Sequence, residues 1–160
     1  MIEGVRITDL KIIEDERGSV RHMLTWNDPH FDQFGEIYFS TIKTGVVKAW
    51  HLHKRMTLNY ACVRGEVMVG LYDLRSESTT FGEQRKIYLA DNGSNYRLLT
   101  IPPGVWNGFR QSADMVREAI FDEAWIANCS TLPHDPDEIT RMDPGDFPAT
   151  FDWGLYEVAG

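Results

Sequence analysis

The sequence predicts a single all-β domain of the sandwich or barrel type, and three features of the 160-residue chain support this. Short runs rich in β-branched and aromatic residues recur at intervals of roughly a dozen residues, with turn residues between them. Helical periodicity is almost absent. In the run 66–74 both alternating faces are largely apolar, which is typical of a strand that is buried on both sides.

The expected strands follow from these runs in chain order. A first strand covers 5–13 and ends at the turn DERG over 15–18. Further strands are expected at 36–44, 46–53, 58–75, 84–90, 96–104 and 115–121.

The segments that connect the expected strands also contain residue patterns that predict local structure. The Asn-Gly pair within 91–95 predicts a tight hairpin turn, and 28–34 is expected to form a short helix. The segment that begins at Thr131 is rich in proline and charge and predicts an irregular C-terminal extension, with one helical turn near 135–139. No repeat or linker interrupts the chain, so one domain over 1–160 is expected.

Composition excludes several classes of function. A net charge of −8 and a pI near 5.0 argue against nucleic acid as the main partner, because phosphate binding needs surplus Lys and Arg. No run approaches the ~18 apolar residues of a membrane span, and the start of the chain lacks the layout of a signal peptide. Cys62 and Cys129 are too few for a disulfide framework. We therefore expect a cytoplasmic protein with no membrane partner, in which both cysteines are reduced packing residues.

Two histidines at the end of one strand are the first candidates for chemistry. His51 and His53 are two residues apart, so their side chains point to the same side of a strand. With Gly45 they resemble the metal-binding motif of cupin barrels. However, Leu58 or Thr57 stands where that motif has a glutamate, and Asn107 stands where it has a further histidine. Two neutral imidazoles supply neither the ligand count nor the charge of a tight divalent site, so no metal is expected.

Five segments resemble the dTDP-4-dehydrorhamnose 3,5-epimerase family, of which the chain would be a divergent member. They are DERG at 15–18, GVVKAWH at 45–51, VRGEVMVGLYDLRSESTTFG at 63–82, LLTIPPGVWNGF at 98–109, and MDP with FDWG at 142–144 and 151–154. The resemblance implies a double-stranded β-helix, the cupin or jelly-roll barrel. It also implies a homodimer that inverts carbons beside the keto group of a nucleotide-linked hexose, with no metal or organic cofactor.

The resemblance assigns roles to four residues. His51 takes the place of the proton-abstracting histidine, and Asp143 takes the place of the aspartate that orients it. This pairing is chemically sound, because a carboxylate on one ring nitrogen fixes the tautomer and raises the basicity of the other. Lys48 replaces an arginine near the substrate and keeps its charge but not its bidentate fork. Arg17 is expected to reach a substrate phosphate.

Other parts of the family's machinery are missing. The lysine beside the substrate keto oxygen aligns with Leu58, an asparagine aligns with Tyr38, and the tyrosine acid falls near Ile120 or Phe121. The loss of one donor to the enolate can cost roughly 3 to 4 kcal/mol. Substitutes are sought among His53, Lys54, Asn59, Tyr60 and Asn107, of which Asn59 and Tyr60 lie on opposite faces of a regular strand. We expect His53, Tyr60 and Asn107 to contact substrate.

Two other functions stay open. The stretch AWHLHK at 49–54 resembles the Gly-x-His-Ala-His-Lys stretch of the 3,4-ketoisomerases, in which two imidazoles can shuttle a proton between adjacent carbons. DERG and DLRSESTTFG fit the epimerases better. A barrel that binds a nucleotide sugar without turnover is the third reading, because the acid and the lysine are missing.

Overall fold

The computed structural model describes residues 1–112 and 122–154, and within them nearly all regular structure is β. The strands are β1 Arg6–Asp9, β2 Ile12–Asp15, β3 Gly18–Arg21, β4 Glu36–Lys43, β5 Val47–His53, β6 Leu58–Arg64, β7 Glu66–Asp73, β8 Gln84–Ala90, β9 Arg97–Ile101, β10 Val105–Gln111, β11 Glu123–Ser130 and β12 Ile139–Arg141. The prediction of an all-β fold is confirmed. The described residues include no helix long and apolar enough to cross a membrane.

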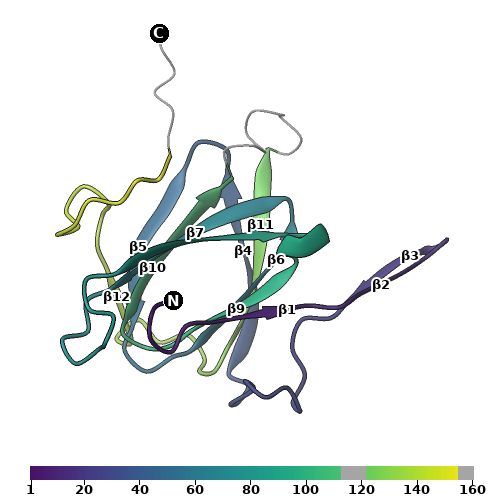
Figure 1. The fold of residues 1–160 in the computed structure, drawn as a ribbon, viewed down its shortest axis with the longest axis horizontal. Helices are drawn as coiled ribbons and strands as arrows, with labels where there is room; N and C mark the ends of the chain where they lie inside the picture. The colour runs from purple at the N-terminus through teal and green to yellow at the C-terminus, as the bar shows by residue number, and fades with distance from the viewer. Residues whose placement is uncertain (113–121, 155–160) are drawn as a thin grey trace, which may run out of the picture.

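Two five-stranded antiparallel sheets pack face to face (Figure 1). One sheet has the order β1-β9-β6-β11-β4, and the other has the order β12-β5-β10-β7-β8. The main core lies between them and contains Leu58 and Tyr60 from β6 and Val69 from β7. Burial of each large apolar side chain contributes about 1.5 to 3 kcal/mol, so this layer supplies most of the stability of the fold.

Strand β7 is buried on both faces, as its sequence predicts. Val69 faces the main core, whereas Met68 lies in a second apolar cluster with Trp153 of the C-terminal segment. Gly70 permits this covering, because a Cβ there would lie 2.7 Å from the rings of Phe151 and Trp153. The C-terminal extension therefore folds back over the outer face of the second sheet.

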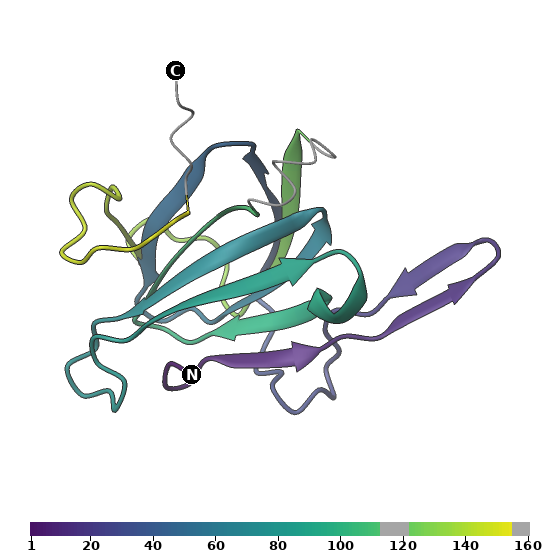
Figure 2. The same ribbon diagram turned by 45° about the horizontal axis from the view of Figure 1, so that its top comes forward.

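The two-stranded arm β2–β3 extends away from the sandwich (Figure 2). Its turn is the predicted one, because Asp15 pairs with Gly18 and the Arg17 N–H donates to Asp15 Oδ1 at 2.8 Å. Ile13 and Val20 lie opposite each other on the arm and are 46% and 61% exposed. An isolated two-stranded ribbon is marginally stable in water, so this apolar pair marks a surface that favours a covering partner.

Several local predictions were wrong or incomplete. The segment 91–95 is not a hairpin turn: it contains a 3-10 helix over Gly93–Asn95 and carries the chain from β8 in one sheet to β9 in the other. Residues 28–34 form turns and coil rather than a helix. Strands β3, β10, β11 and β12 were not predicted, because polar residues interrupt their patterns, and the single strand expected at 5–13 is divided into β1 and β2. The strand expected at 115–121 lies outside the described residues.

The two cysteines match their prediction. Cys62 and Cys129 are both buried and both free. Burial raises the pKa of the Cys62 thiol to about 12, so this group is an inert packing residue.

Candidate active site

A cavity of about 330 Å³ opens beside the end of β5, and both predicted histidines line it. Its walls come from β4, β5, β12 and the segment after β12, and they comprise Tyr38, Lys48, Ala49, Trp50, His51, His53, Ile139, Arg141, Met142 and Asp143. A smaller cavity of about 90 Å³ lies deeper in the barrel and shares Tyr38, Lys48 and His51 with the first. His51 is thus at the junction between the entrance and the interior.

A β-bulge in β5 brings Lys48 to the same cavity as His51. On β10, Asn107 pairs with His51 and Phe109 pairs with Lys48, so the two residues of β5 between Lys48 and His51 lie opposite the single residue Gly108 of β10. The extra residue breaks the alternation that would otherwise place positions 48 and 51 on opposite faces. Gly108 allows the close approach, because a Cβ there would lie 2.3 Å from the Cβ of Ala49.

His51 is a neutral imidazole. Its pKa is lowered to about 4, chiefly because burial disfavours the charged ring. Positive charge on His53, Arg141 and Lys48 acts in the same direction. The ring packs edge-on against Phe109, with centroids 6.4 Å apart. A neutral ring is in the state that can accept a proton.

Asp143 lines the same cavity as His51, as the resemblance implies. In residues 1–112 and 122–154, no hydrogen bond or ion pair joins this carboxylate to the His51 ring. The segment that carries Asp143 is tied to β5 by the backbone, since Trp50 and Met142 exchange N–H···O bonds of 2.6 and 3.0 Å. The structure therefore brings the two residues into one site without a direct contact, and the orienting role of Asp143 stays a prediction.

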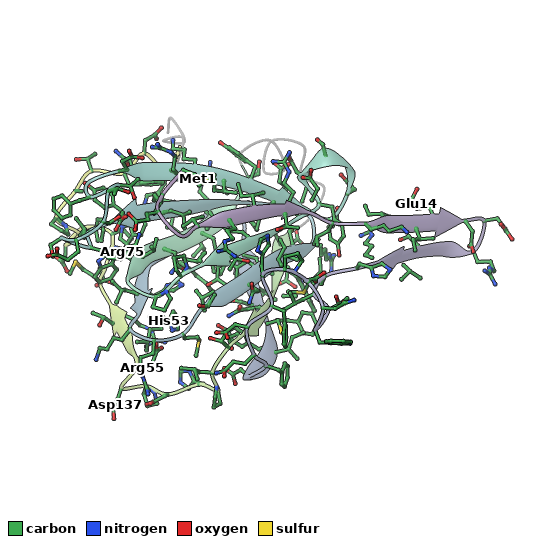
Figure 3. The ribbon with its side chains drawn as sticks, turned by 60° about the horizontal axis from the view of Figure 1, so that its bottom comes forward. Met1, Glu14, His53, Arg55, Arg75 and Asp137 are labelled. Atoms are coloured by element: carbon green, nitrogen blue, oxygen red, sulfur yellow. The ribbon has the colours of Figure 1, made fainter. Side chains whose placement is uncertain are left out.

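The histidine that has a carboxylate partner is His53. Its Nδ1 lies 2.7 Å from Oε2 of Glu138, and both side chains are buried. His53 lies at the end of the molecule away from the arm, near Arg55 and Asp137 (Figure 3). Sequence reasoning missed Glu138, because 85 positions separate it from His53 in the chain and only the fold brings the two side chains together.

Two further candidates meet inside the barrel. Tyr60 lines the deeper cavity, and its hydroxyl donates to Asn107 Oδ1 at 3.3 Å. Burial raises the pKa of Tyr60 well above its ordinary value, so the phenol stays protonated. The amide of Asn107 donates to the carbonyl of His51 at 3.2 Å. Asn107 thus supports Tyr60 and His51 and is not a wall of either cavity.

The remaining site residues divide into two groups. Lys48 and Arg141 place positive charge at the outer cavity, and Arg141 was missed by sequence reasoning although it pairs in register with His51. Arg17 lies in the turn of the arm, and its side chain is 82% exposed. Arg17 lines neither cavity beside His51, and its expected contact with a substrate phosphate stays a prediction.

The residues at the cupin metal positions do not fit a metal ion. Leu58 lies in the apolar core, and the amide of Asn107 is engaged by Tyr60 and by the His51 carbonyl. In the part of the chain that the structure describes, no group of three or more His, Cys, Asp and Glu side chains is arranged to hold a metal.

Comparisons with known proteins place the whole chain among nucleotide-sugar epimerases and their relatives in sequence and fold. A family model described as dTDP-4-dehydrorhamnose 3,5-epimerase matches residues 1–131. The spore coat polysaccharide biosynthesis protein SpsL of Bacillus subtilis is 31% identical over 153 residues, which cover 96% of this chain and 97% of the relative. The probable low-salt glycan biosynthesis epimerase Agl13 of Haloferax volcanii is 31% identical over 116 residues, covering 71% and 72% of the two chains. The crystal structure of a dTDP sugar isomerase from Desulfovibrio desulfuricans superposes with a TM-score of 0.85 at 39% identity, covering 99% of this chain and 96% of that one.

Proposed function

The chain belongs to the dTDP-4-dehydrorhamnose 3,5-epimerase family, and on this premise we propose that it epimerises a nucleoside-diphosphate-linked 4-keto-6-deoxyhexose. One observation carries the proposal beyond family membership. A neutral imidazole, His51, lies at the junction of two cavities and is flanked by the cationic side chains Lys48 and Arg141.

This arrangement suits proton abstraction beside a ketone. The carbon–hydrogen bond breaks, its proton passes to the free ring nitrogen of His51, and the electron pair moves toward the keto oxygen as an enolate. A proton from solvent is then delivered to the opposite face of the same carbon, which inverts it and restores the ketone, and His51 releases the abstracted proton to solvent. Asp143 orients the His51 ring once substrate closes the site, while Lys48 and Arg141 attract the anionic diphosphate.

Arg17 takes part through a homodimer. The arm that carries it leaves the sandwich, and its apolar pair Ile13 and Val20 lies exposed. When a second copy of the chain covers Ile13 and Val20, Arg17 lies near the cavity of that second copy, where the guanidinium can bind a substrate phosphate. The proposal predicts a dimer by analytical ultracentrifugation, and a monomer at all concentrations would contradict it.

A cytoplasmic location is consistent with the proposed epimerase function. Cys62 and Cys129 are free thiols in the structure. Unpaired cysteines are typical of a reducing compartment. The substrate would be a nucleotide sugar made for carbohydrate biosynthesis.

A 3,4-ketoisomerase is the second candidate, and the paired histidines favour it. The rings of His51 and His53 line one cavity with centroids 6.3 Å apart. Two bases on one side of a sugar can move a proton between adjacent carbons, whereas epimerisation needs donation from the opposite side. The epimerase proposal takes precedence because the family match covers residues 1–131.

The purified protein is incubated with dTDP-4-keto-6-deoxyglucose in deuterated water, and carbons 3 and 5 are followed by NMR. Deuterium at both carbons supports a 3,5-epimerase, and deuterium at one carbon supports a single epimerisation. A keto group that moves to carbon 3 identifies the ketoisomerase. Binding without any exchange supports the nucleotide-sugar-binding protein and overturns the proposed activity.

A further inference from the structure

Inversion of a carbon requires a proton donor on the side of the sugar opposite the base. Two tyrosines, Tyr38 and Tyr60, line the deeper cavity together with His51. We infer that Tyr38 is the general acid, which donates its phenol proton to the face of the enolate that is turned away from His51. This inference rests on the proposed function and adds a second catalytic residue to it.

Tyr38 and His51 reach the same space from opposite walls. Tyr38 lies on β4 of one sheet, and His51 lies on β5 of the other. Both side chains line the outer cavity, and both also line the deeper one. A sugar ring that lies between the two sheets at this point has the imidazole on one face and the phenol on the other. This placement is the one that inversion requires of a base and an acid.

The amide of Asn128 determines how the hydroxyl of Tyr38 is oriented. Its Oδ1 accepts the backbone N–H of Asn59 at 3.1 Å, so Nδ2 is the atom that faces Tyr38. This Nδ2 donates to the phenol oxygen of Tyr38 at 2.9 Å. Because the phenol oxygen is the acceptor in this bond, its own O–H points elsewhere. In residues 1–112 and 122–154 no protein group accepts that proton, so it is available to the cavity.

Tyr60 differs from Tyr38 because its hydroxyl proton already has an acceptor. Nδ2 of Asn107 is engaged by two backbone carbonyls, so its Oδ1 faces Tyr60 and accepts the hydrogen bond of the hydroxyl at 3.3 Å. Tyr60 is also 3% exposed, whereas Tyr38 is 38% exposed. Solvent therefore has better access to Tyr38 and can restore its proton after each turnover. Of the two tyrosines in the cavity, Tyr38 is the one that can give up a proton and regain it.

The groups around Tyr38 suit an acid that loses its proton only briefly. Partial burial raises the pKa of Tyr38 above its ordinary value, and the carboxylate of Glu36 acts in the same direction, so the phenol is protonated at neutral pH. The Asn128 amide and the cation of Arg141 act in the opposite direction, because both favour the phenolate. Tyr38 therefore keeps its proton in the resting protein and has two neighbours that stabilise the anion formed during the reaction.

The step balances without any further reactant. The carbon–hydrogen bond breaks, its proton passes to His51, and the electron pair is held in the enolate. The O–H bond of Tyr38 then breaks, its proton forms a bond to the opposite face of the same carbon, and the phenol oxygen keeps the electron pair as a phenolate. The imidazolium of His51 releases its proton to water and the phenolate takes a proton from water, which restores both residues.

The test compares Tyr38→Phe with wild type in deuterated water, with dTDP-4-keto-6-deoxyglucose as the substrate. Deuterium in the recovered starting isomer reports abstraction and return of a proton on the His51 face. Deuterium in the inverted product reports delivery from the opposite face. Without the phenol, exchange into the starting isomer should continue, while the rate of inversion should fall about 10²- to 10³-fold. Structural damage to the site would instead lower both rates together.

Two more variants control the test. Tyr88→Phe removes a tyrosine hydroxyl from β8, where the residue is 45% exposed and lines neither cavity, and it should leave both rates unchanged. Asn128→Asp can still accept the N–H of Asn59, but it presents an acceptor to Tyr38 in place of a donor. The carboxylate would then take the phenol proton, so inversion should fall relative to exchange.

The outcomes separate the two proposals. If wild type exchanges no deuterium, or exchanges it without inverting a carbon, the proposed function fails, and this inference fails with it. If wild type inverts carbon and a folded Tyr38→Phe variant keeps the wild-type ratio of inversion to exchange within about threefold, the inference alone is overturned. If Tyr38→Phe does not fold, Asn128→Asp decides by the same ratio, and an unchanged ratio would refute the assignment.

Discussion

Substitution of Gly108 by alanine tests how the bulge in β5 builds the site. A Cβ at position 108 would lie 2.3 Å from Ala49 Cβ, 2.8 Å from Ala49 Cα and 2.9 Å from the carbonyl oxygen of Lys48. Ordinary contact between carbon atoms begins near 3.5 Å, so β5 and β10 must separate by about 1.2 Å at this point. Two of the three contacts are with backbone atoms, which cannot rotate away.

The expected effect is large in both stability and rate. Overpacking of this kind costs about 3 kcal/mol, which lowers Tm by about 6 to 12 °C in a chain of this size. Because the displaced segment joins Lys48 to His51, kcat should fall about 100-fold in the folded variant.

Differential scanning calorimetry measures the change in Tm, and the deuterium-exchange assay, run below the melting transition, measures the change in rate. Gly145→Ala is the control, since its Cβ would have nothing within 4 Å and its backbone is not left-handed. A Gly108→Ala variant that melts within 2 °C of wild type and keeps its rate would refute this account of the bulge.

Three further predictions address charge and assembly. Because the pKa of native His51 is lowered to about 4, unfolded chains bind more protons than folded ones between pH 6.5 and 4. The free energy of unfolding should therefore decrease as the pH falls through this window. In urea titrations, His51→Gln should make this decrease smaller. Asp73→Asn breaks a buried contact with Arg75 and should cost about 3 to 5 kcal/mol in urea unfolding, whereas a loss below 1 kcal/mol would argue against a structural ion pair. If Arg17 acts across a dimer, equal mixtures of Arg17→Ala and His51→Ala should regain about a quarter of wild-type activity after subunit exchange, and no regain would place Arg17 outside the partner's site.

Much of the fold was predictable because strand signals are local. The two apolar faces of β7 and the DERG turn both follow from spacing over a few residues, and both are confirmed. Strand β10 escaped prediction because all of its residues are buried, including Asn107 and Arg110, so it shows no alternation of polar and apolar residues. The Asn-Gly pair within 91–95 gave a wrong prediction of a hairpin turn, because the chain there crosses from one sheet to the other and does not reverse within one sheet.

The candidate site was predictable in part. His51 and His53 line one cavity because their spacing in the strand puts them on one face, and Asp143 reaches the same cavity. Tyr60 points into the barrel, while Asn59 on the other face is held by Cys129 and Thr100. Nothing in the local pattern of β6 chooses between these two orientations, since both of its faces are buried.

The sequence by itself determined the β architecture, the DERG turn and the shared face of the two histidines, because each depends on side-chain alternation within one strand or on the residues of one turn. Only the tertiary structure decided that Glu138 meets His53, that Lys48 joins His51, and that Arg141 flanks the cavity. These contacts arise where β12 pairs with β5 and where β5 gains one residue against β10. Pairing partners and bulges are set by the energy of the assembled sheets, and no local run of residues encodes them.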